Sequence, residues 1–189
     1  LAGFCAALLA LAAVTALAEE EGFVVVFPHG TGSPLHWKSN LASGQPNPDL
    51  DYFDAVLTEV QGALCLDERR TYATGLSNGA MFTSVLLCER AAVLAAAAPA
   101  AALTDSDKCE PSRPVPVMTV HGTADPILLF NGGVNVSAIP GGGGAEEPPV
   151  PTTTMAPADL DGDGYPAAVR AFAERNGCDP EPTDTEKTA

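Results

Sequence analysis

The chain has few basic residues. It carries 9 lysines and arginines against 24 aspartates and glutamates, which gives a formal net charge of −15 over 189 residues. Nucleic acids and anionic membrane surfaces repel a protein of this charge, so neither is an expected partner. The acidic balance favours solubility and indicates no particular mechanism.

The five cysteines lack the spacing of a metal site. Cys5, Cys65, Cys88, Cys109 and Cys178 form no Cys-x-x-Cys pair, so no zinc site is expected. In an exported protein some of them should be paired. We predict a disulfide between Cys88 and Cys109, because both flank a strand-like apolar run. The alternative is that both are buried free thiols.

No apolar run is long enough for a stable membrane anchor. Residues 1–17 are almost wholly apolar, but a span needs about 20 residues. Ala16-Leu17-Ala18 resembles a signal-peptidase site, and acidic residues begin at Glu19. Two interpretations of residues 1–18 therefore stay open: a secretory signal, or a buried alanine-rich helix. Residues 19–189, in a chain that is 46% apolar, suit one domain.

A nucleophilic serine is indicated at Ser77. The run Gly75-Leu76-Ser77-Asn78-Gly79 follows a β-prone segment, 70–74, and precedes an apolar segment, 80–87. Strand, Gly-x-Ser-x-Gly turn and helix together form a sharp elbow that holds a serine hydroxyl clear of a sheet. Flanking glycines let the strand and helix backbones approach each other. The alternative is a glycine-rich turn with an ordinary serine.

A serine nucleophile needs a histidine base and a carboxylate, and on this architecture the chain order is Ser, Asp, His. Asp125 fits the second place, because it follows the predicted buried strand 115–120 in a strand-end loop. We expect Ser77 and Asp125 at the carboxyl ends of neighbouring parallel strands. The alternative for Asp125 is an Asp-Pro turn.

The histidine is missing from its expected place. His29, His36 and His121 all precede Asp125 in the chain. We interpret His121 as a structural residue at a strand end. His29, which follows the predicted strand 23–27, is a weaker candidate for the base, since a lone histidine in a turn is usually structural.

The remaining pattern alternates strands and helices, which predicts an α/β protein with a doubly wound sheet. Asn47 can cap a helix that has Pro48 at its first position and an apolar face through Leu64. We predict two further helices, at 78–90 and 166–175, and a strand at 92–98.

A Gly-, Pro- and Thr-rich stretch, about 134–160, is predicted to be a flexible insert. It contains the glycosylation sequon Asn135-Val136-Ser137. Residues 159–164 then copy the first half of a calcium-binding loop. The second half fails, because position 12 is Arg170 and not a glutamate. We expect an acidic turn there, with a weak surface calcium site as the alternative.

The chain resembles the polyhydroxybutyrate depolymerase and feruloyl esterase family of secreted serine esterases, which have the α/β-hydrolase fold. The resemblance covers most of residues 17–180, apart from the stretch near 134–160. It is carried, in chain order, by these segments: Ala18–Pro28, Trp37, Asp67–Gly79, Cys88-Glu89, His121–Pro126 with Asn131–Gly133, and Asn176–Cys178.

The resemblance implies an extracellular carboxylic ester hydrolase that needs no cofactor. Ser77 would be the nucleophile, Asp125 would orient the histidine, and the backbone N–H of Asn78 would form half of the oxyanion hole. The implied substrates are a small aryl ester, a feruloylated polysaccharide or a hydroxyalkanoate polyester. Two alternatives remain: a non-catalytic α/β module that binds carbohydrate or calcium, and a serine peptidase on the same fold.

The departures from the family pattern are specific. The family has an early His-Gly loop that completes the oxyanion hole, and no such loop precedes Glu19. Its catalytic histidine lies in a C-terminal His-Thr-Trp-like segment, which this chain lacks. His29 stands where the family commonly has an acidic residue, and Cys178 matches a family cysteine whose partner would lie beyond this chain. We therefore expect an α/β-hydrolase fold that is incomplete at both ends and inactive by itself.

Overall fold

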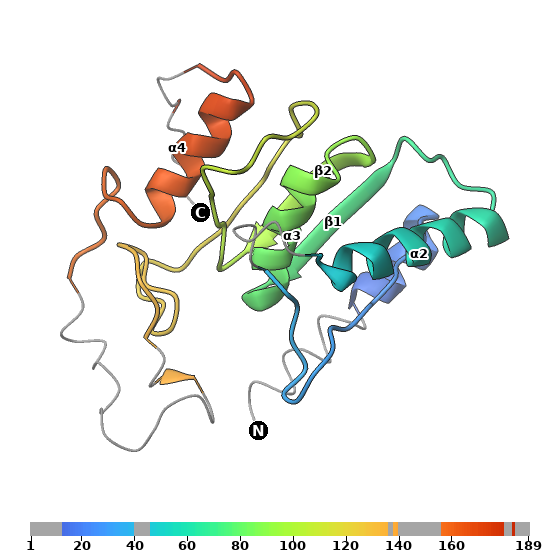
Figure 1. Cartoon of the computed structure of the whole chain (residues 1–189), viewed down its shortest axis with the longest axis horizontal. Coiled ribbons are helices and arrows are strands. Elements are labelled where there is room, and N and C mark those ends of the chain that lie inside the picture. The colour runs from blue at the N-terminus through green and yellow to red at the C-terminus, as the bar shows by residue number, and fades with distance from the viewer. Residues whose placement is uncertain (1–12, 40–45, 136–137, 140–155, 180–182, 184–189) are drawn as a thin grey trace. The chain divides into compact units, whose positions relative to one another are not determined.

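The computed structural model describes residues 13–39, 46–135, 138–139, 156–179 and 183 (Figure 1). The chain divides into two units, Leu1–Leu35 and His36–Ala189. The predicted insert 134–160 and the sequon lie mostly outside the described residues.

The first unit contains a helix over residues 13–21. Gly22 ends it with a positive φ of 71°, and the N–H groups of Gly22 and Phe23 donate to the carbonyl of Ala18. Ala18 is buried, whereas Val14 and Leu17 are 39% and 48% exposed. A helix is therefore present where the second interpretation of residues 1–18 places one.

The predicted strand at 23–27 is not found. These residues are irregular, and Phe23, Val24, Val26 and Phe27 are each 45–51% exposed. A strand forms only when its backbone groups pair with a neighbour. No ladder joins this run to any other described residue, so its apolar, β-branched composition is not enough to make it a strand.

The second unit is built on a parallel β-α-β crossover. Strand β1 (Thr71–Leu76), helix α3 (Asn78–Glu89) and strand β2 (Leu94–Ala100) follow one another, and β1 pairs with β2 in parallel. The predicted β-prone segment 70–74, helix 78–90 and strand 92–98 are confirmed as β1, α3 and β2. Both strands end two residues later than predicted.

A third segment continues this sheet on the far side of β2. Val117 and Val120 form parallel bridges with Ala97 and Ala100. The N–H of Met118 donates to the carbonyl of Ala97 at 3.0 Å. The predicted strand 115–120 is therefore a short parallel partner of β2, held by isolated bridges and not by a full ladder.

Helix α3 covers one face of this sheet and supplies more of the buried residues of the main core cluster than any other element. It packs on both β1 and β2 (Figure 1). Its buried side chains include Phe82, Val85, Leu86 and Leu87. Because this helix is apolar on nearly all sides, it belongs in an interior.

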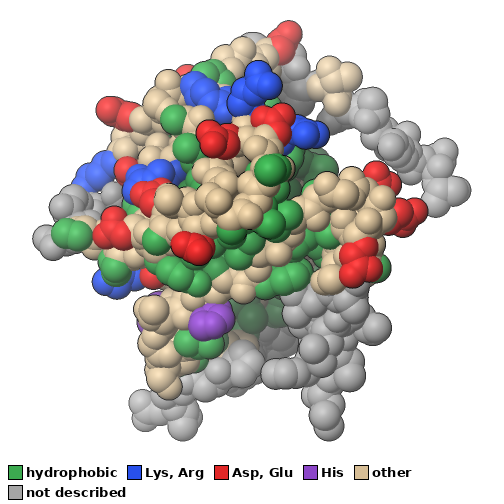
Figure 2. All heavy atoms as spheres, turned by 90° about the vertical axis from the view of Figure 1, so that its right-hand side faces the viewer, with side chains coloured by type: hydrophobic (Ala, Val, Ile, Leu, Met, Phe, Trp, Pro, Cys, Tyr) green, Lys and Arg blue, Asp and Glu red, His purple; other side chains and the backbone are tan. Residues whose placement is uncertain are grey.

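The described residues include a set of apolar side chains from the sheet that stay exposed. Among them are Tyr72, Leu76, Met118 and Val120, which are 59–70% exposed. Figure 2 shows one face of the molecule, on which hydrophobic side chains gather and acidic side chains border them. Helices on both faces of the sheet, as a doubly wound fold requires, are not seen in the described part of the chain.

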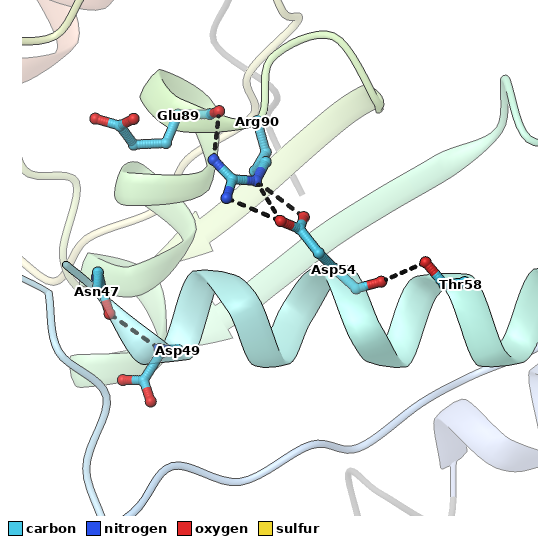
Figure 3. A network of polar contacts seen from close by, with 6 residues as sticks. All are labelled: Asn47, Asp49, Asp54, Thr58, Glu89 and Arg90. Atoms are coloured by element: carbon cyan, nitrogen blue, oxygen red, sulfur yellow. Dashed lines mark hydrogen bonds and ion pairs between the residues drawn. The ribbon is translucent and has the colours of Figure 1, made fainter.

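Helix α2 (Pro48–Ala63) begins as predicted. The side chain of Asn47 accepts a hydrogen bond from the N–H of Asp49, and Pro48 occupies the first turn. Arg90, at the end of α3, binds the carboxylate of Asp54 with both Nε and Nη2 (Figure 3). Hydrogen bonding to Asp54 raises the pKa of the Arg90 guanidinium. This forked ion pair ties α2 to α3.

Helix α4 (Tyr165–Arg175) confirms the predicted helix at 166–175. Ala168 and Phe172 of this helix join the main core cluster. Its last residue, Arg175, pairs with Asp105 at 2.7 Å. No helix among the described residues is long and apolar enough to cross a membrane.

The predicted disulfide is confirmed: Cys88 of α3 is bonded to Cys109. Cys65 and Cys178 are exposed free thiols. The bond closes a loop with a sequence separation of 21 residues, which contains β2 and the segment that returns toward α3.

Replacing both Cys88 and Cys109 by serine should lower the free energy of unfolding by about 3 kcal/mol, because a loop of this length no longer restricts the unfolded chain. Urea unfolding under non-reducing conditions measures this change. The matched control is Cys65→Ser with Cys178→Ser, which should change stability by less than about 0.5 kcal/mol. Equal stabilities of the two double variants would contradict the structural role of the bond.

Candidate active site

Ser77 lies at the junction of β1 and α3 in an uncommon backbone conformation. Its φ is 54° and its ψ is −118°, a region that costs free energy for any residue with a side chain. The side chain is exposed. It occupies the N-cap position yet makes no capping hydrogen bond, although serine at this position usually caps. The hydroxyl is therefore not engaged in capping the helix that it precedes.

The sharpness of this turn depends on Gly75. A Cβ atom at Gly75 would lie 2.3 Å from the backbone C and O atoms of Gly79 and 2.8 Å from the N atom of Ala80. The first turn of α3 thus rests directly on the backbone of β1. Gly79 itself has space for a side chain, since a Cβ there meets nothing within 4 Å. Of the two motif glycines, only Gly75 is required by packing.

Asn78 is the first residue of α3, where a helix leaves its N–H groups without acceptors inside the helix. The positive end of the helix dipole lies there as well. The Asn78 side chain forms two hydrogen bonds with the backbone of Trp37: Oδ1 accepts from its N–H at 2.6 Å, and Nδ2 donates to its carbonyl at 3.1 Å. The Trp37 ring stacks on Phe82, with 4.7 Å between centroids. A distant segment is thereby fixed beside the elbow.

The sheet register places three chain segments at one edge. Leu76 lies opposite Ala100, and Ala100 opposite Val120. The N–H of Ser77 donates to the carbonyl of Ala100 at 3.1 Å, and the N–H of Ala101 to the carbonyl of Val120 at 2.8 Å. The prediction that Ser77 and Asp125 follow neighbouring strands is wrong, because β2 lies between their strands. Two strand spacings, about 10 Å, separate the strand that precedes Ser77 from the strand that precedes Asp125.

Asp125 lies in the loop that follows this third strand. Its Oδ1 accepts hydrogen bonds from the N–H groups of Ile127 at 2.9 Å and Leu128 at 3.0 Å. Its own N–H donates to the carbonyl of Gly122 at 3.1 Å. Within the described part of the chain, Oδ2 accepts no hydrogen bond. One oxygen thus orders the loop, and the other is available to a further donor.

The three histidines have different environments. His29 belongs to the first unit and is exposed, and its Nδ1 lies 3.4 Å from the carbonyl of Gly30. His36 is exposed. His121 is 3% exposed at its side chain, and its Nε2 donates to the carbonyl of Leu128 at 2.8 Å. The structural interpretation of His121 agrees with this buried, hydrogen-bonded position.

The acidic turn 159–164 is stabilised by the side chain of an arginine. Arg170 donates to three carbonyl oxygens, those of Leu160, Asp161 and Gly162, at 2.7–3.1 Å. Oδ1 of Asp159 accepts the N–H of Asp161. Arg170 stands at position 12 of the calcium-loop pattern, where a calcium-binding loop has a glutamate. Its guanidinium binds carbonyl oxygens of the same turn for which a weak calcium site was the alternative prediction. No group of three metal-binding side chains occurs among the described residues.

Residues 10–111, just over half of the chain, match the family described as "Prolyl oligopeptidase family". The chain belongs to this family. The matched region contains the whole elbow, with β1, Ser77 and α3, and it ends before Asp125. Membership supports the α/β-hydrolase fold that the β-α-β unit displays in part.

Relatives among characterised proteins are esterases by name. Feruloyl esterase B of Piromyces equi is 31% identical over 121 residues, 61% of this chain and 23% of the relative. The bifunctional acetylxylan esterase/xylanase XynS20E of Neocallimastix patriciarum is 33% identical over 114 residues, 60% of this chain and 16% of the relative. Feruloyl esterase C of Emericella nidulans is 32% identical over 89 residues, 47% of this chain and 33% of the relative.

The chain thus spans only a sixth to a third of the length of these relatives. No solved structure matches the chain.

Sequence reasoning missed the two side-chain networks that hold the site. The pairing of Asn78 with Trp37 joins residues 41 positions apart, and only the presence of Trp37 in the family-like segments pointed to it. The bond from His121 to Leu128 ends on a backbone carbonyl, which has no signature in the residue type.

Gly75→Ala should destabilise the second unit by about 1–3 kcal/mol or more, because its Cβ collides with the backbone of α3. Gly79→Ala is the matched control: it has space, and alanine favours a helix over glycine by about 1 kcal/mol. Chemical denaturation of the two variants measures the difference. Equal effects of the two substitutions would show that the elbow does not depend on the contact at Gly75.

Proposed function

We propose that the protein is a carboxylic ester hydrolase with Ser77 as its nucleophile. The observation that supports this most directly is the backbone conformation of Ser77, with its positive φ and its uncapped, exposed hydroxyl. A strained serine between a parallel strand and a helix is what the nucleophile elbow of α/β-hydrolases requires. The esterase names of the relatives favour an ester as substrate.

The reaction proceeds by acyl transfer. The Ser77 Oγ attacks the ester carbonyl carbon, and a histidine base takes the hydroxyl proton. The N–H of Asn78, at the start of α3, donates to the developing oxyanion. The alcohol leaves with the proton from the histidine, and water then repeats the sequence to release the acid. Asp125 orients the histidine through Oδ2, the oxygen that is not used within its own loop.

The substrate class follows from the relatives and the family. Feruloyl and acetylxylan esterases act on esters by name, and we propose an ester of a polysaccharide, with small aryl esters also accepted. A hydroxyalkanoate polyester is the alternative ester. We further propose that the protein works outside the cell, where the Cys88–Cys109 disulfide is stable.

A peptidase is the second candidate, because the family itself is described as that of prolyl oligopeptidase. The two activities are separated by parallel assays with a p-nitrophenyl ester and a peptide p-nitroanilide. Ester turnover with little anilide turnover supports the esterase, and the reverse ratio supports the peptidase. No turnover of either would favour the non-catalytic module.

In the full-length gene product, Ser77→Ala should remove nearly all hydrolysis of a p-nitrophenyl ester, by several powers of ten in kcat, because no other group forms the acyl-enzyme. Stopped or continuous absorbance assays measure this loss. The matched control is Ser39→Ala, which changes a half-buried serine outside the elbow whose hydroxyl donates to Sδ of Met81. Turnover that survives in Ser77→Ala would remove Ser77 from the nucleophile role.

Asp125→Asn should lower kcat by about 10⁴-fold with the fold retained, because the histidine would then adopt the wrong tautomer. The remaining Oδ1 can still accept both loop N–H groups, so urea unfolding should change little. A loss of kcat below tenfold would assign Asp125 to the turn alone.

A further inference from the structure

His121 connects the strand end to the loop that carries Asp125. Its Nε2 lies 2.8 Å from the carbonyl oxygen of Leu128. A carbonyl oxygen only accepts hydrogen bonds, so Nε2 carries the proton. The N–H of the same residue, Leu128, donates to Oδ1 of Asp125. Leu128 is therefore bound at its carbonyl by the imidazole of His121 and at its N–H by the carboxylate of Asp125.

The imidazole is also near the second carboxylate oxygen. Nε2 of His121 lies 3.8 Å from Oδ2 of Asp125, too far for a hydrogen bond. Oδ2 thus stays available to another donor, with the imidazole next to it. The other nitrogen, Nδ1, is buried and has no hydrogen-bond partner among the described residues. The bond to Leu128 is accordingly the hydrogen bond through which the ring acts on this loop in the described part of the chain.

The ring itself is fixed by its aromatic neighbours. Tyr165, the first residue of α4, lies 4.7 Å from it between centroids, and Phe130 lies 6.0 Å away in an edge contact. The hydroxyl of Tyr165 donates to Oγ1 of Thr119 at 3.1 Å, and that hydroxyl donates to the carbonyl of Pro99 in β2 at 2.9 Å. The imidazole therefore has little freedom to rotate, and its position is tied to the sheet.

We propose that His121 is a positioning residue for Asp125, acting through the hydrogen bond from Nε2 to Leu128. This inference rests on the proposed function. The bond holds Leu128 at its carbonyl, the N–H of the same residue orders Oδ1, and the direction in which Oδ2 faces the catalytic histidine is fixed through this residue. A displacement of a catalytic group by about 1 Å costs about 100-fold in rate, so the loss of this bond should be visible in kcat and not in KM.

The test compares three variants of the full-length gene product with a p-nitrophenyl ester. His121→Leu removes the donor and should lower kcat by about 10- to 100-fold with KM unchanged. His121→Gln places an amide N–H near the position of the histidine Nε2, so it can donate to Leu128 and should retain most of the wild-type kcat. His121→Asn has the same amide on a shorter side chain, which does not reach Leu128, and should resemble His121→Leu. If His121→Leu does not fold, the comparison of Gln with Asn decides alone.

A double-mutant cycle with Asp125→Asn separates positioning from general structure. If His121 acts through the carboxylate, His121→Leu should change kcat by less than about threefold in the Asp125→Asn background. An equal loss in both backgrounds, or equal kcat in the Gln and Asn variants, would overturn the positioning role. Ser77→Ala is measured in parallel: if it retains turnover, the proposed function fails first and this inference with it, whereas Ser77-dependent turnover confines a failure to His121.

Discussion

The contact between the backbones of β1 and α3 at Gly75 constrains the rest of the candidate site. An atom at the Cβ position would lie 2.3 Å from the peptide of Gly79, so the helix can begin there only if residue 75 has no side chain. The chain must then reverse within two residues, and the positive φ of Ser77 is the result. Strain at this residue is maintained by the packing of α3, whose buried side chains join the main core cluster.

The parallel register extends this constraint across the sheet. Leu76, Ala100 and Val120 lie at one level, so the segments that follow them leave the same edge. Carboxyl ends of parallel strands are where α/β folds collect functional groups. The elbow contributes a serine and a helix N-terminus, and the third strand contributes the loop of Asp125. The middle strand, β2, contributes no candidate catalytic side chain but sets the spacing between the other two.

Much of this arrangement could be predicted from local sequence signals. The cap at Asn47 with Pro48 defined the start of α2, and the glycine-serine motif defined the junction of β1 and α3. The Cys88–Cys109 bond was expected because both residues flank one strand. These signals work because each depends on a few adjacent residues or on a simple alternation.

Other features depend on partners that no local pattern names. The run Phe23–Phe27 has strand-like residues, yet no ladder forms with another described residue. The order of strands, with β2 between those of Ser77 and Asp125, is a property of pairing. The roles of Arg170 and His121 depend on backbone carbonyls at Leu160 and Leu128, and a carbonyl is the same in every residue.

The central claim is that Ser77 is the residue that becomes acylated. The most direct measurement is labelling of the full-length gene product with a fluorophosphonate ester, followed by peptide mapping by mass spectrometry. The reagent reacts with serines activated as nucleophiles, and ordinary hydroxyls react slowly. We expect one adduct, on the peptide that contains Ser77. An adduct on a different serine of a catalytically active preparation would contradict it.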